Sequence, residues 1–103
     1  MKQQNSLNKI GSIELPALSL QGCNAPGRQH SYAQYLRRDV ITSLWLEAAG
    51  DIANEQALIA TCHLLPIHQA LWWITHRVSA RGLITGMCSD VVVARVQGRE
   101  NNV

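Results

Sequence analysis

The stretch NEQALIATCHLLPIHQALWWITHRVSARGLI, residues 54–84, decides the fold that this sequence predicts. Asn54 suits the N-cap of a short helix, because its side-chain oxygen can accept from free amides of the first turn. Leu58 and Cys62 then recur at a helical spacing. Pro66 ends this helix and can open the next one, since a first-turn position needs no amide donor.

A second helix is predicted over residues 67–81, with Gly82 as its stop. Four apolar residues would share its buried face: Ile67, Leu71, Ile74 and Val78. Two helices joined by a tight turn are typical of the helix-turn-helix motif. This motif is the strongest signal in the chain.

The residues before the motif predict a flexible arm and one supporting helix. Residues 1–30 are rich in Asn, Gln, Ser, Gly and Pro, which favours a flexible N-terminal arm that could also contact DNA or a partner. Within it, a short extended piece could pack on the domain through Ile13, Leu15, Leu18 and Leu20. Ser31 can cap an amphipathic helix that runs to about Ala49 and stops at Gly50. We expect Trp45 to anchor this helix in the core, and Ile52 to be buried in the link that follows.

The residues after the motif predict a β-hairpin. Leu83–Met87 and Val91–Val96 are short apolar runs around the turn-like residues 88–90. A helix, a helix-turn-helix and a C-terminal hairpin in that order make a winged helix. We therefore expect a mainly α fold with a small β-hairpin: a winged helix-turn-helix domain over residues 31–97, with a polar tail at 98–103.

The outer face of the predicted second helix carries side chains that suit DNA. In a helix-turn-helix this face enters the major groove. Gln69 can read adenine through two hydrogen bonds, and Arg77 can reach phosphate or base acceptors. The candidate DNA-binding residues are His68, Gln69, Trp72, Trp73, His76 and Arg77, with Arg95 and Arg99 on the hairpin side.

The adjacent tryptophans allow several interpretations. Neighbouring residues on a helix point about 100° apart, so Trp72 and Trp73 cannot both join one narrow core stripe. Trp72 can fold against the hairpin, and we expect Trp73 to be largely exposed. An exposed tryptophan here could contact DNA, a second copy of the chain, or another protein.

Composition and charge limit the possible functions. The 103 residues suit one small domain, and the net charge of +2 gives no general attraction to nucleic acid. However, residues 66–103 carry four arginines against two carboxylates, so this part is basic. Three cysteines without CxxC spacing fit a cytoplasmic protein, and we expect neither a signal peptide nor a membrane span.

The sequence gives little support for a catalytic site or a metal site. Cys62 and His63 are adjacent and diverge on a helix, and no Gly-rich phosphate loop occurs. A zinc site from Cys62, His63, His68 and Cys88 lacks paired-ligand spacing, so we favour buried structural cysteines. We expect neither an enzyme nor a cofactor.

The stretch from about Ser43 to Cys88 resembles the CaiF/GrlA family of enterobacterial transcriptional regulators. The resemblance is carried by Ser43-Leu44-Trp45, Ile52, Ile59-Ala60, Ala70 and Ile74-Thr75. It implies a winged-helix DNA-binding activator. Members commonly continue beyond the hairpin, and they can carry strongly basic residues where this chain has His68 and Gln69.

The sequence thus predicts a transcriptional regulator that binds double-stranded DNA specifically, with residues 67–81 as recognition helix. We expect a cytoplasmic, nucleoid-associated homodimer that acts as an activator, with another regulatory protein or RNA polymerase as a further partner. The alternative is a winged-helix interaction module that holds a protein partner through Trp72 and Trp73 without reading DNA.

Overall fold

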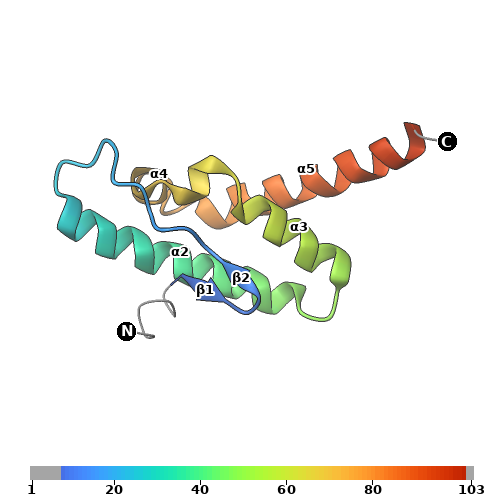
Figure 1. The fold of residues 1–103 in the computed structure, drawn as a ribbon, viewed down its shortest axis with the longest axis horizontal. Helices are drawn as coiled ribbons and strands as arrows, with labels where there is room; N and C mark the ends of the chain where they lie inside the picture. The colour runs from blue at the N-terminus through green and yellow to red at the C-terminus, as the bar shows by residue number, and fades with distance from the viewer. Residues whose placement is uncertain (1–7, 102–103) are drawn as a thin grey trace.

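The computed structural model describes residues 8–101, with side chains described through residue 93. These residues form a mainly helical fold with one small antiparallel sheet (Figure 1). The elements are β1 (Lys9–Ile10), β2 (Ile13–Glu14), α2 (Pro26–Ala48), α3 (Ile52–Cys62), the 3-10 helix η1 (Leu65–His68), α4 (Ala70–Thr75) and α5 (Ala80–Asn101). The predicted class of a mainly α fold with one small hairpin is confirmed, but the hairpin lies at the N-terminal end.

The supporting helix α2 is longer than predicted. It starts at Pro26 rather than at Ser31, because proline at the first helical position needs no amide partner. Its buried side chains include Ala33, Arg37 and Ile41, which lie four residues apart on one face. The helix ends at Ala48, and Gly50 then takes a φ of +88°, which favours glycine.

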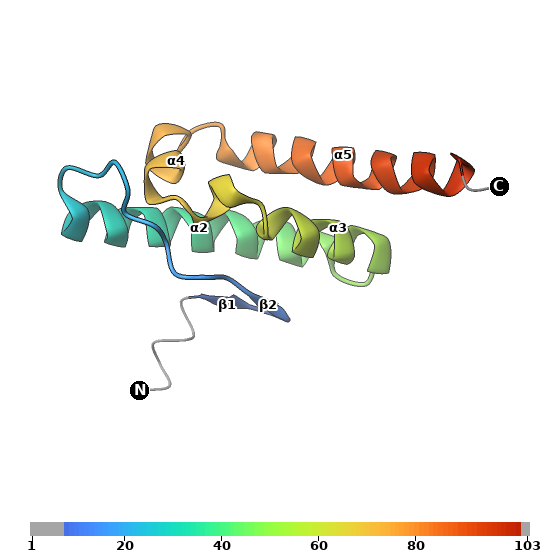
Figure 2. The same cartoon turned by 45° about the horizontal axis from the view of Figure 1, so that its top comes forward.

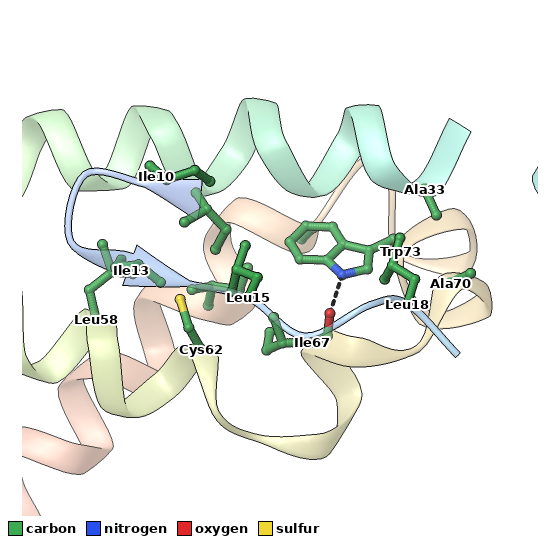
Figure 3. Packing of buried hydrophobic residues seen from close by; sticks show 13 residues of the cluster. Ile10, Ile13, Leu15, Leu18, Ala33, Leu58, Cys62, Ile67, Ala70 and Trp73 are labelled. Atoms are coloured by element: carbon green, nitrogen blue, oxygen red, sulfur yellow. Dashed lines mark hydrogen bonds between the residues drawn. The ribbon is translucent and has the colours of Figure 1, made fainter. Parts of the chain in front are cut away.

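Residues 8–30, predicted as part of an arm, include an extended piece that packs on the domain, as expected for Ile13, Leu15 and Leu18 but not for the exposed Leu20. Strands β1 and β2 pair Ile10 with Ile13, and four apolar side chains are buried in the core: Ile10, Ile13, Leu15 and Leu18. Beyond the hairpin the chain crosses the core (Figure 3) and reaches the start of α4. There the Ser19 amide donates to the His68 carbonyl at 2.7 Å, and the Ser19 carbonyl accepts from the Ala70 amide at 2.9 Å. Residues 1–7 lie outside the described part.

The hairpin turn requires glycine for two reasons. Gly11 has a φ of +58°, and a Cβ atom at this position would overlap the indole ring of Trp45. Trp45 is partly buried and packs against the core, as expected for an anchor of α2.

Helix α3 starts three residues earlier than the sequence suggested. Its N-cap is Asp51, whose Oδ1 accepts from the Asn54 amide at 3.2 Å, so Asn54 lies in the first turn. Ile52 is 73% exposed, contrary to the expectation that it is buried. Leu58 and Cys62 are buried as the spacing predicted.

The predicted second helix over residues 67–81 is not continuous. Pro66 lies in η1, α4 spans only Ala70–Thr75, and residues 76–79 form a turn before α5 begins. Gly82 therefore lies inside α5 and does not end a helix. Two helices joined by a short connection are present, as α3 and α4 joined through η1, but the second helix is short.

The buried face of α4 also differs from the predicted one. Trp73 is fully buried, while Val78 is 93% exposed. The Trp73 Nε1 donates to the Ile67 carbonyl at 2.7 Å (Figure 3). Burying an indole removes more apolar surface from water than burying a leucine or valine, and the hydrogen bond satisfies its polar atom. The expectation that Trp73 is exposed is therefore wrong.

The predicted C-terminal hairpin over residues 83–96 is also wrong, because these residues lie in α5. Ala80 and Ile84 are buried, and Met87, Cys88 and Val91 are half-buried. This spacing is helical, and it outweighs the β propensity of the valines because it lets α5 pack on α3 (Figure 2). Helix α5 continues to Asn101, so the predicted tail at 98–103 is helical up to that residue.

Candidate nucleic-acid interface

Carboxylates are absent from the sequence segments that build one end of the molecule. Residues 15–38 and 56–89 contain no Asp or Glu. The first half of α2, all of α4 and the turn at 76–79 belong to these segments, and α4 packs on α2 (Figure 1). Three of the seven carboxylates lie toward the connection between α2 and α3: Glu47, Asp51 and Glu55. Glu47 nevertheless pairs with Arg81 at the start of α5, so the surface without carboxylates is limited to the surroundings of α4 and the first half of α2.

A shallow concavity of about 360 Å³ lies on the outer side of α4. Its lining consists of Gln21, Gln69, Leu71, Trp72, Thr75 and His76. These side chains provide two amides, one hydroxyl, one imidazole and one indole. Such a set can form hydrogen bonds and can also stack on a flat or apolar group.

Two of the aromatic side chains of this concavity contact each other. The ring centroids of Trp72 and His76 are 5.0 Å apart, with the planes tilted by 50°. Trp72 also meets the buried Trp73 edge to face at 5.0 Å. Trp73 thus supports Trp72 from below, and the half-buried Trp72 presents its ring to the concavity.

The structure brings together three of the predicted DNA-binding residues. Gln69, Trp72 and His76 line the same concavity. Arg77 follows directly in the turn, is exposed, and donates from Nη1 to the Ile74 carbonyl at 2.9 Å. Because Arg77 has further donors in its planar fork, this bond leaves it able to bind an anion.

Other predicted site residues lie elsewhere. Trp73 is buried and cannot contact DNA. His68 is half-buried, and its pKa is lowered by burial and by the nearby Arg37 and His63. His68 is therefore uncharged at neutral pH and offers no cation to a phosphate. Arg95 and Arg99 belong to the C-terminal part of α5, which extends away from α4 (Figure 2).

Arg37 and Cys62 lie close together inside the core, and we interpret their role as structural. Arg37 is 1% exposed, and its Nη2 donates to Asn8 Oδ1 at 3.0 Å. Burial lowers the pKa of Arg37 to about 10, and the nearby Cys62 partly opposes this. Burial and Cys88 raise the pKa of Cys62 to about 12. At neutral pH the guanidinium stays charged and the thiol stays protonated, so Cys62 is a poor nucleophile.

Three residues of the concavity were missed by the sequence analysis: Gln21, Thr75 and Leu71, which was predicted on the buried face but is exposed. Gln21 comes from the segment interpreted as an arm, and it reaches α4 because Ser19 pairs with the backbone on both sides of Gln69. Thr75 faces outward at the end of α4. No local pattern in the sequence indicates the contact of Gln21, which depends on a long-range backbone bridge.

Comparisons with protein-family models, with curated proteins and with solved structures gave no match to this chain. Within residues 8–101, no helix combines the length and apolar character that crossing a membrane requires. The described residues also contain no group of three or more His, Cys, Asp or Glu side chains that could hold a metal ion.

Proposed function

We propose that this chain is a transcriptional regulator that binds double-stranded DNA in a sequence-specific way. The contact is made by the outer face of α4 and by the turn at residues 76–79. The observation that carries this proposal is the open concavity that Gln69, Trp72 and His76 share, whose lining contains no carboxylate. A surface that binds a polyanion needs this absence of negative charge.

Each exposed group has a role in the proposed contact. Gln69 can donate and accept in the pair of hydrogen bonds that recognises adenine. Trp72 offers an apolar ring to thymine methyl groups or sugars. Arg77 pairs with a phosphate and positions the protein without reading sequence.

The short α4 limits how many bases can be read. Six residues at about 1.5 Å each make a helix roughly 9 Å long, which presents fewer side chains than the predicted helix over 67–81. We therefore propose that α3, η1 and α4 form a compact helix-turn-helix. No wing follows it within the described residues, and so the winged part of the CaiF/GrlA plan has no counterpart there. The resemblance to that family supports the regulatory role, and activation by a homodimer remains part of the proposal.

The alternative, a protein-interaction module based on both tryptophans, loses one of its two contacts because Trp73 is buried. Trp72 alone, supported from below and bordered by polar side chains, fits the edge of a base pair as well as a protein surface. Because the lining of the concavity contains no carboxylate, we favour DNA over a protein partner.

The test uses fluorescence anisotropy with a duplex from the gene's own upstream region and a scrambled duplex. We expect Gln69→Ala to reduce the discrimination between the two by about 1–3 kcal/mol. We expect Arg77→Ala to weaken binding equally on both duplexes and to lower the salt slope by about 1.

Two variants outside the proposed site serve as matched controls: Gln56→Ala on α3 for the amide, and Lys9→Ala on β1 for the charge. Both positions are exposed, and neither change should alter discrimination or slope. If Gln69→Ala and Arg77→Ala behave like these controls, the proposed site is wrong.

A further inference from the structure

A second surface beside α4 has the chemistry of a nucleic-acid contact. A groove of about 610 Å³ lies between α4 and the first half of α2, and its lining includes Arg28, Gln29, Ser31, Tyr32, Tyr35 and Ile74. Tyr32 is 44% and Tyr35 is 66% exposed, so both rings face solvent although they are large and partly apolar. The lining contains no carboxylate.

This groove and the concavity of the proposed function lie on the two sides of α4. Ala70 and Trp73 are buried, so the opposite face of α4, with Thr75, points outward. Trp72 borders the concavity on one side, while Ile74 borders the tyrosine groove on the other. Helix α4 therefore lies between two depressions: a polar one lined by Gln69, Thr75 and His76, and a mainly apolar one lined by Tyr32, Tyr35 and Ile74.

The dimensions of DNA fit this ridge and its flanks. The major groove is about 12 Å wide, which admits one helix, and a phosphate backbone runs along each of its edges. When α4 enters the groove, one backbone faces the side of His76 and Arg77. The other backbone then faces the side of Arg28, Tyr32 and Tyr35.

The charge of Arg28 points to an anionic occupant. Arg28 is exposed in the first turn of α2, which contains no acidic residue. A cation is unfavourable next to the positive end of a helix dipole, and a bound anion reverses this effect. The tyrosine hydroxyls can donate to phosphate oxygens without adding charge.

We infer that Arg28, Tyr32 and Tyr35 hold the phosphate backbone of the second strand of the same duplex that α4 reads. This inference rests on the proposed function and extends it from one edge of the major groove to both. The groove contributes affinity and orientation, whereas Gln69 contributes discrimination between sequences.

The test measures anisotropy on the upstream duplex and on a random-sequence duplex, over about 50 to 200 mM salt. We expect Arg28→Ala to weaken binding on both duplexes by the same factor and to reduce the salt slope by about 0.9, the value for one lost phosphate contact. The double variant Tyr32→Phe/Tyr35→Phe keeps both rings and should weaken binding to both duplexes with an unchanged slope. Circular dichroism establishes that each variant is folded.

Two controls remove similar groups outside the groove. Lys9→Ala removes a cation from β1, and Leu46→Ala shortens an exposed side chain in the second half of α2. Neither should change affinity or slope. If Arg28→Ala gives the same result as Lys9→Ala, the inference is wrong.

The outcomes separate this inference from the function on which it rests. If Gln69→Ala reduces discrimination while the variants of the groove bind like the parent, the inference fails and the proposed function stands. If the parent protein binds no duplex, the proposed function itself fails. If the groove variants abolish self-association in sedimentation and leave DNA binding unchanged, the groove belongs to a second copy of the chain, and the inference is overturned.

Discussion

Trp73 gives the sharpest test of the packing, because the sequence predicted it exposed and the structure buries it. The ring is fully buried, its Nε1 donates to the Ile67 carbonyl at 2.7 Å, and it supports Trp72 edge to face. Truncating a buried aromatic ring to alanine costs about 3–5 kcal/mol. A domain of this size is stabilised by roughly 5–15 kcal/mol in total, so Trp73→Ala is expected to be partly unfolded.

Trp73→Phe is therefore the more informative variant. Phenylalanine keeps most of the apolar burial but leaves the Ile67 carbonyl without its donor, which costs about 1–3 kcal/mol. Trp72→Phe is the matched control, since Trp72 is half-buried and its indole makes ring contacts with Trp73 and His76 instead of a hydrogen bond. The free energy of unfolding is measured by urea titration followed by far-UV circular dichroism.

We expect Trp73→Phe to lower the free energy of unfolding more than Trp72→Phe, by at least about 1 kcal/mol. Equal effects of the two substitutions, or a larger effect at Trp72, would refute the burial of Trp73 and with it the orientation of α4.

Three further predictions concern other parts of the fold. Because the pKa of Cys62 is raised from 9.0 to about 12 in the folded state, the stability it contributes is complete below pH 9 and is lost as the pH rises toward 12. Cys62 should therefore lower the free energy of unfolding in this range by at most about 1.4 kcal/mol per pH unit. Arg37, whose folded-state pKa is lowered to about 10, opposes this fall above that pH, so the contribution of Cys62 is measured as the difference in slope between the parent and Cys62→Ala. Asp51→Ala should cost about 1 kcal/mol by removing the cap of α3, whereas Asn54→Ala should cost less, and the reverse order would contradict the observed cap. Glu47 and Arg81 form an exposed ion pair between α2 and α5, so a double-mutant cycle in urea should give a coupling of about 0.2–1 kcal/mol, and no coupling would place these helices differently.

The sequence predicted those features that depend on local spacing. The end of α2 near Gly50, the burial of Leu58 and Cys62 on α3, and the interruption at Pro66 are all confirmed. Each follows from a single strong local preference, such as the conformational freedom of glycine or the missing amide of proline.

The faces of the later helices could not be fixed in the same way. Leu71 and Val78 fit one apolar stripe along a helix, but Ala70 and Trp73 fit an alternative apolar stripe on a neighbouring face. The choice depends on which side meets α2 and the segment of Leu18, which is a long-range contact. Likewise, the sequence of residues 83–96 is compatible with either a hairpin or a helix. These residues form a helix because α5 packs on α3.

The candidate site was predicted in part. Gln69 and His76 were placed on the outer face of the predicted helix and Trp72 beside it, and the three share a concavity. The contributions of Gln21 and of the tyrosine groove were missed, because both come from segments that reach α4 only through tertiary packing. Regions interpreted as an arm and as a support therefore supply part of the proposed interface.

The most direct test of the proposed function is the salt dependence of DNA binding by the parent protein. Anisotropy on the upstream duplex and on its scrambled counterpart is measured at about 50 and 200 mM salt. We predict tighter binding to the upstream duplex. We also predict a slope of log affinity against log salt of about −0.9 if Arg77 alone contacts phosphate, and about −1.8 if Arg28 does so as well. Binding that is the same on both duplexes and unchanged by salt, or no binding at all, would contradict the proposal that this end of the molecule reads DNA.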